Sequence, residues 1–204
     1  MSILIVGLTG QTGAGKSTVA AKLAEKGLYI IDGDAAAREI MIPGAPVLKK
    51  LAAVFGADII NQDGSLNRKL LATRAFANRE NTLKLNGITH PVITRLVKQK
   101  IAQAEKRGER AAVIDAAALL ESGIAPLCEL IAVITAPEEE RLGRIMRRDK
   151  LSRSDAFKRI SAQLNEDWYR TRADIILATY PPETADSEVE RLIALIDEKT
   201  NKFR

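Results

Sequence analysis

The eight residues Gly10-Gln11-Thr12-Gly13-Ala14-Gly15-Lys16-Ser17 decide the fold of this 204-residue chain. They fit the pattern G-x-x-x-x-G-K-[ST], in which glycines let successive backbone N–H groups curl around a phosphate. A β-branched run at residues 3–6 precedes them, and residues 17–26, with apolar side chains at helical spacing, follow. This order of strand, loop and helix suits the motif, because the helix N-terminus adds positive potential at the anion. The sequence therefore predicts a phosphate-binding loop at residues 10–17.

The side chains that follow the loop indicate a nucleotide with its metal ion. Lys16 can reach the β- and γ-phosphates, and the hydroxyl of Ser17 is placed to bind Mg²⁺, so ATP with Mg²⁺ is predicted. Residues 13–15 and Thr18 complete the predicted nucleotide site. The alternative is a glycine-rich turn with a solvated lysine. The loop alone also does not separate a kinase from a GTPase, an ATPase or a regulator.

Four further apolar runs predict strands that are buried on both faces, at residues 28–31, 111–114, 130–134 and 174–177. Because these runs alternate with helical stretches, we expect an α/β fold in which a parallel five-stranded sheet is flanked by helices. The glycine-rich loop makes this fold the type found in P-loop NTPases.

Residues 35–110 separate the second predicted strand from the third and contain no convincing strand pattern. Helices are expected at residues 35–41, 46–55, 68–77 and 81–106, with breaks at Pro43-Gly44, Asp63-Gly64 and His90-Pro91. This stretch is too long for a simple crossover. We therefore predict a nucleotide-binding core at residues 1–34 and 111–204, and a helical acceptor-binding insertion at residues 35–110.

Carboxylates follow two of the predicted strands. Asp32 and Asp34 end the second, at the edge of the sheet where ligands gather in open α/β folds. One of them could orient or accept the proton of an acceptor hydroxyl, and the other could act through the water shell of the metal. The alternative is that Asp34 caps the helix at residues 35–41. Asp115, which ends the third strand, is either a metal-site carboxylate or a cap.

Basic residues concentrate in one zone of the chain. The net charge is +5, whereas residues 141–172 alone hold ten Lys and Arg against four Asp and Glu. Arg141, Arg144 and Arg148 share one narrow arc of a helix, which suits a lid that closes over a phosphoryl group. We predict this lid at about residues 141–163, with Arg144 and Arg148 at the nucleotide. The alternative is a solvated face paired with residues 138–140.

Composition excludes several classes of protein. No apolar run is long enough to cross a membrane, and the N-terminus lacks a basic leader. One cysteine, Cys128, and one histidine, His90, cannot form a disulfide or a structural zinc site, and each is expected to be a packed residue more often than a reactive one. Aromatic residues make up only 4% of the chain, which argues against a nucleic-acid platform. A cytoplasmic protein with no nucleic-acid, membrane or obligate protein partner is predicted.

The chain resembles the dephospho-coenzyme A kinases over nearly its whole length. Beyond the phosphate loop, the resemblance rests on Asp32-Gly33-Asp34 with Ala37-Arg38, on the His90-Pro91 step, on Leu119-Leu120-Glu121, on Arg144 with Arg147-Arg148-Asp149, and on Arg172-Ala173-Asp174. It implies a P-loop kinase with a core, a lid and coenzyme A-binding helices. It also implies ATP-dependent phosphorylation of the 3′-hydroxyl of dephospho-coenzyme A.

The same resemblance implies roles for individual residues. Asp34 would be the catalytic carboxylate, with Asp32 nearby and with Thr9, Lys16 and Arg144 beside it. The acceptor side would be lined by four residues: Arg38, His90, Leu119 and Glu121.

The chain departs from the family at two places. Ala116-Ala117-Ala118 replace the usual proline and larger apolar residues, and Leu177-Ala178-Thr179-Tyr180 replace an Asn-containing loop, so no adenine contact is assigned. The alternatives are another small-molecule kinase of this class, acting on a nucleoside or nucleotide, and a non-catalytic nucleotide switch.

Overall fold

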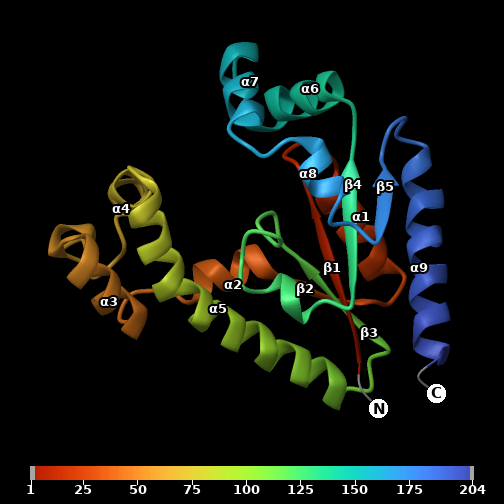
Figure 1. Cartoon of the computed structure of the whole chain (residues 1–204), viewed down its shortest axis with the longest axis horizontal. Helices are drawn as coiled ribbons and strands as arrows, with labels where there is room; N and C mark the ends of the chain where they lie inside the picture. Colours follow the sequence, from red (N-terminus) through yellow and green to blue (C-terminus); the bar gives the residue numbers. More distant parts are fainter. Residues whose placement is uncertain (1–2, 203–204) are drawn as a thin grey trace.

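The computed structural model describes residues 3–202 and contains one parallel sheet of five strands in the order β2-β3-β1-β4-β5 (Figure 1). The strands are β1 (Leu4–Gly10), β2 (Tyr29–Asp32), β3 (Ala111–Asp115), β4 (Leu130–Thr135) and β5 (Ile175–Ala178). In register, Val6 of β1 pairs with Val113 of β3 and with Leu130 of β4. The predicted parallel five-stranded sheet flanked by helices is confirmed.

Helices cover both faces of the sheet. In chain order they are α1 (Lys16–Glu25), α2 (Gly33–Glu39), α3 (Pro46–Phe55), α4 (Arg68–Ala75), α5 (Arg79–Lys106), α6 (Glu138–Asp149), α7 (Arg153–Ser161), α8 (Glu166–Arg170) and α9 (Thr184–Lys202), with short 3₁₀ turns η1 (Ala57–Ile59) and η2 (Ala125–Leu127). The segment between β2 and β3 is helical, as expected. Figure 1 shows α6 and α7 standing beyond the edge where the strands end.

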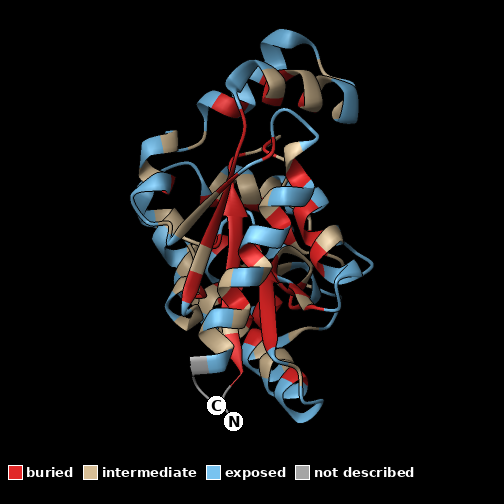
Figure 2. Ribbon diagram, turned by 90° about the vertical axis from the view of Figure 1, so that its right-hand side faces the viewer, coloured by how far each residue is buried: buried red, intermediate tan, exposed pale blue. Residues whose placement is uncertain are grey.

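Two apolar clusters hold the layers together. On one face, Val19 and Leu23 of α1 and Leu192 of α9 pack with the β1 side chain of Leu8. On the other face, α2 and α5 pack on the sheet, and α3 packs against α5, with residues such as Leu51 and Val97 in the same apolar cluster. The strands of the centre are almost wholly buried (Figure 2), as a parallel sheet covered on both faces requires. A third, small cluster joins α6 to α7 and makes them one unit.

Several predicted element boundaries differ from the structure by one or two residues, and three larger differences each have a local reason. Strand β1 runs on to Gly10, because its ladder with β4 continues to the pair Gly10–Ile134. Helix α2 begins at Gly33 rather than at residue 35, because Asp32 accepts a hydrogen bond from the Ala35 amide and so caps it. Helix α5 does not break at His90-Pro91 but continues through Pro91 over 28 residues.

Candidate active site

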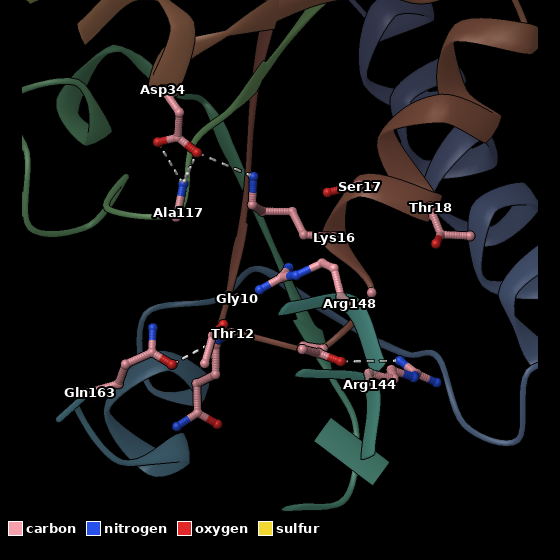
Figure 3. Close-up of a pocket in the computed structure, with 14 residues that line it drawn as sticks. Gly10, Thr12, Lys16, Ser17, Thr18, Asp34, Ala117, Arg144, Arg148 and Gln163 are labelled. Atoms are coloured by element: carbon pink, nitrogen blue, oxygen red, sulfur yellow. Dashed lines mark hydrogen bonds and ion pairs between the residues drawn. The ribbon is translucent and has the colours of Figure 1, made fainter. Parts of the chain in front are cut away.

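The phosphate loop forms the floor of a cavity of about 470 Å³ at the edge where the strands end (Figure 3). Besides residues 10–18, the cavity is lined by Asp34, Ala117, Arg144, Arg148 and Gln163. The structure thus brings together the loop, one of the two predicted aspartates and two of the three predicted arginines.

Two glycines give the loop its shape. Gly13 has φ +78° and Gly15 has φ +98°, a region of backbone conformation that other residues rarely adopt. A Cβ atom at Gly13 would also lie 2.7 Å from the backbone oxygen of Arg141, where α6 packs on the loop. The curl that turns the loop N–H groups toward an anion therefore depends on glycine at both positions.

Lys16 is held between two carboxylates. Its ammonium donates a hydrogen bond to Asp115 and lies 3.8 Å from Oδ2 of Asp34. Burial raises the pKa of Asp115, and the hydrogen bond from Lys16 offsets part of this. Asp115 is therefore the partner of the loop lysine, whereas the sequence left open whether it was a metal-site residue or a cap.

The two aspartates near the end of β2, Asp32 and Asp34, have different environments. Asp32 caps α2, accepting from the Ala35 amide at 2.6 Å, and lies 3.5 Å from the Arg38 guanidinium. The suggested capping role of Asp34 is therefore wrong. Asp34 instead points into the cavity (Figure 3), where both of its carboxylate oxygens lie 3.3 Å from the backbone nitrogen of Ala117. Of the two, only Asp34 lines the cavity.

Thr9 lies behind this arrangement rather than in the cavity. Its side chain is fully buried, and its hydroxyl donates a hydrogen bond of 3.1 Å to the carbonyl of Ala117. The backbone of Ala117 thus connects Thr9, through its carbonyl, to Asp34, through its N–H. Thr9 does not line the cavity, so its position suits a positioning residue that acts through Ala117, for which no local signal exists in the sequence.

The three arginines of the predicted arc have different environments. Arg144 donates to the carbonyls of Gly13 at 3.3 Å and Thr179 at 3.0 Å, and also pairs with Glu140 at 3.0 Å. Arg148 lines the cavity and pairs with its neighbour Asp149.

Arg141 does not reach the cavity. Its side chain is buried and burial lowers its pKa, so the prediction of three arginines facing one phosphate is wrong for this residue.

The segment between α7 and α8 touches the phosphate loop directly. Gln163 accepts a hydrogen bond of 2.8 Å from the Thr12 amide, and Gln11 donates one of 2.9 Å to the Leu164 carbonyl. Figure 3 shows Gln163 reaching the loop from the side opposite Asp34. This link between the predicted lid and the loop was not anticipated from the sequence.

Comparisons with known proteins agree with this geometry. The family model described as dephospho-CoA kinase matches residues 4–180. The chain belongs to the dephospho-CoA kinase family. A dephospho-CoA kinase of Corynebacterium efficiens is 42% identical over 195 residues, covering 95% of this chain and 98% of that protein. The resemblance noted in the sequence is thereby confirmed.

Solved structures share this fold, and one of them is a dephospho-CoA kinase. A crystal structure from Thermus thermophilus matches with a TM-score of 0.82 and 29% identity, covering 98% of both chains. The dephospho-CoA kinase from Campylobacter jejuni matches with a TM-score of 0.69 and 27% identity, covering 96% of this chain and 98% of its own. Among residues 3–202, no helix is long and apolar enough to cross a membrane.

The four residues expected on the acceptor side of this kinase do not line the cavity. Arg38 is exposed on α2, and His90 is half-buried on α5, where burial lowers its pKa. Glu121 accepts a hydrogen bond of 3.1 Å from the hydroxyl of the buried Tyr169. Leu119 is fully buried against Gly7, so its expected place in a ligand-binding surface is wrong and it belongs to the core.

An Asp32→Ala variant is expected to lower the free energy of unfolding by about 1 kcal/mol, the usual loss when a helix cap is removed. Turnover should stay within about threefold of wild type, because Asp32 faces the α2 amides and Arg38. Urea unfolding and steady-state kinetics measure the two quantities. Asn67→Ala removes the comparable cap of α4, away from the cavity, and serves as the matched control. A hundredfold loss of turnover in Asp32→Ala alone would give Asp32 a direct part in the reaction.

A Thr9→Val variant is expected to lower kcat about tenfold with little change in KM for ATP. Loss of the hydroxyl leaves the Ala117 carbonyl without its buried donor, and the peptide that holds Asp34 can then shift. Thr9→Ser should recover most of the rate. Equal stability losses with an unchanged kcat in both variants would make Thr9 a purely structural residue.

Proposed function

We propose that this protein transfers the γ-phosphoryl group of ATP to the 3′-hydroxyl of dephospho-coenzyme A, giving coenzyme A and ADP. The observation that carries the proposal is Asp34, which faces Lys16 at 3.8 Å across the phosphate loop in a chain of this family. A loop lysine and a carboxylate that faces the cavity at this separation fit the two partners of the reaction, a phosphate chain and a hydroxyl.

The loop would bind the nucleotide. Lys16 leaves Asp115 for the β- and γ-phosphates when ATP arrives, and the amides at the start of α1 donate to the remaining phosphate oxygens. The hydroxyl of Ser17, in the first turn of α1 beside the cavity, is an oxygen ligand of the kind that Mg²⁺ prefers. When bound, Mg²⁺ would supply charge neutralisation at the phosphates. Thr18 also lines the cavity.

Asp34 would handle the acceptor. The hydroxyl oxygen of the acceptor attacks the γ-phosphorus, the bond from that phosphorus to the β,γ-bridging oxygen breaks, and ADP leaves. The hydroxyl proton passes to the Asp34 carboxylate and then to solvent. The Ala117 amide keeps the carboxylate in one orientation, which supports a productive approach of the hydroxyl.

The lid would complete the site. We assign residues 141–163 to a lid that brings Arg144 and Arg148 toward the transferring phosphoryl group and excludes water. We assign residues 35–110 to an acceptor-binding unit and residues 1–34 and 111–204 to the nucleotide-binding core. Arg38, His90 and Glu121 are the candidates for coenzyme A contacts. The activity would operate in the cytoplasm and requires no nucleic acid, membrane or protein partner.

The test is ADP release with Mg²⁺ and ATP, comparing dephospho-coenzyme A, adenosine, AMP and no acceptor at equal concentration. Turnover that depends on dephospho-coenzyme A, with coenzyme A as product, is the expected result. Turnover on adenosine or AMP instead would keep the phosphoryl transfer but replace the substrate. Tight ATP binding without turnover on any acceptor would favour a nucleotide switch.

A further inference from the structure

Thr179 is a buried residue at the back of the phosphate loop that the proposed reaction does not use. It follows β5 directly, is 3% exposed, and donates its backbone N–H to the Thr135 carbonyl at 3.0 Å. Its position beyond the sheet is therefore fixed by the backbone ladder between β4 and β5.

Besides a longer contact of 3.5 Å with the Thr135 carbonyl, the Thr179 hydroxyl makes two hydrogen bonds that meet at the loop. It donates to the carbonyl of Ala14 and accepts from Nη1 of Arg144 at 3.2 Å. A hydroxyl has one donor and can accept as well, so both of these bonds can form at once. Thr179 thus links the guanidinium of Arg144 to the Ala14 carbonyl of the phosphate loop.

The bond to Ala14 decides which way one loop peptide faces. In a planar trans peptide the carbonyl and the next N–H point in opposite directions. With the Ala14 carbonyl held by Thr179, the Gly15 N–H must point away from Thr179, toward the interior of the loop. A flip of this peptide would turn a carbonyl oxygen inward, where its partial negative charge repels phosphate.

We propose that Thr179 is a positioning residue for the nucleotide phosphates, which fixes the Ala14–Gly15 peptide so that the Gly15 amide donates to them. This inference rests on the proposed binding of ATP. It also explains why position 15 must be glycine: a Cβ there would lie 2.9 Å from the Thr179 hydroxyl and 3.1 Å from Nη1 of Arg144. The loop and the hydroxyl fit together only without that side chain.

The experiment compares ADP affinity in the full-length chain, measured calorimetrically with Mg²⁺, for wild type, Thr179→Val and Thr179→Ser. Valine keeps the shape but removes the hydroxyl, and we expect the Kd for ADP to rise about tenfold or more. Serine keeps the hydroxyl and should bind within about threefold of wild type. In turnover assays the KM for ATP should rise in Thr179→Val more than kcat falls.

The matched control is Thr89→Val. Thr89 is also a buried threonine with its hydroxyl on a carbonyl, that of Leu85 within α5, but it lies outside the cavity. Thr89→Val should change the melting temperature without changing the Kd for ADP. If Thr179→Val does not fold, Thr179→Ala provides the same comparison without the added methyl group.

Two results would overturn the inference. One is a Thr179→Val variant that binds ADP within about twofold of wild type, since the hydroxyl would then not shape the loop. The other is an equal loss of affinity in the valine and serine variants, since the loss would then come from packing. Failure of the wild type itself to bind ADP would instead overturn the proposed function and the inference with it.

Discussion

An Asp34→Asn variant is expected to lower kcat by about 10³-fold while leaving the Kd for ADP within about twofold of wild type. Asparagine has the same shape and can still accept from the Ala117 amide, so the position of the side chain is kept. It cannot take up the proton of the acceptor hydroxyl. Steady-state turnover with dephospho-coenzyme A and calorimetric ADP binding measure the two effects.

The control for Asp34→Asn is Glu39→Gln, which removes a carboxylate from the same helix. Glu39 lies 3.2 Å from Lys100 and outside the cavity, so turnover should stay close to wild type. A rate in Asp34→Asn that matches the control would remove Asp34 from the chemical step. The transfer would then rely on positioning and on the charges around the phosphoryl group alone.

The sheet could be predicted from the sequence because its signals are local. Each strand is a short β-branched run, and the alternation with helices dictates parallel pairing. The continuity of α5 could not be predicted in this way. Pro91 costs a helix about 3 kcal/mol, yet Thr89, Ile93 and Val97 are buried on either side of it. Burial of an aliphatic side chain such as Ile93 or Val97 contributes about 1.5–3 kcal/mol, so the two together offset the cost of the proline.

At the start of α2, too, the folded structure departs from what local helix propensity predicts. Glycine is a poor helix former, so the sequence favours a start after Gly33. The structure places Gly33 against β3, where a Cβ would lie 2.8 Å from the Ala116 side chain. Glycine is required at position 33 because two segments 83 residues apart in the sequence approach closely there. No sequence pattern near Gly33 predicts this contact.

The residues of the candidate site also fall into two groups, those that local sequence patterns predict and those that only long-range contacts reveal. The loop, Lys16 and Asp34 follow from a motif and from the rule that ligands gather where parallel strands end. The amide of Ala117 and the hydroxyl of Thr179 act on the site through hydrogen bonds to residues 83 and 165 positions away. Backbone amides and small hydroxyls carry no sequence signature, so only the folded chain reveals these partners.

A Lys16→Met variant is expected to lower kcat/KM for ATP by about 10³-fold, the loss found when a central charge on a transition-state oxygen is removed. The ammonium donates a hydrogen bond to Asp115 and lies 3.8 Å from Oδ2 of Asp34. Without it, the carboxylates face the incoming phosphates with no cation on the loop, and like charges then disfavour binding as well as transfer. Turnover at several ATP concentrations separates these effects.

Lys22→Met is the matched control, because Lys22 lies on the same helix and pairs with the exposed Asp186. A surface ion pair of this kind contributes about 0–1 kcal/mol, so activity should be unchanged.

Stability provides a second readout for Lys16→Met. Burial already raises the pKa of Asp115, and the hydrogen bond from Lys16 opposes that shift, so removing the lysine raises the pKa of Asp115 further. An acid whose folded-state pKa lies above its unfolded value loses stability as pH rises, because folding then buries the charge. Lys16→Met should therefore gain stability relative to wild type as pH falls from 7 toward the ordinary pKa of an aspartate, and Asp115→Asn in the same chain should abolish that trend. A flat difference between Lys16→Met and wild type over this range would mean that Lys16 and Asp115 are not coupled in the folded protein.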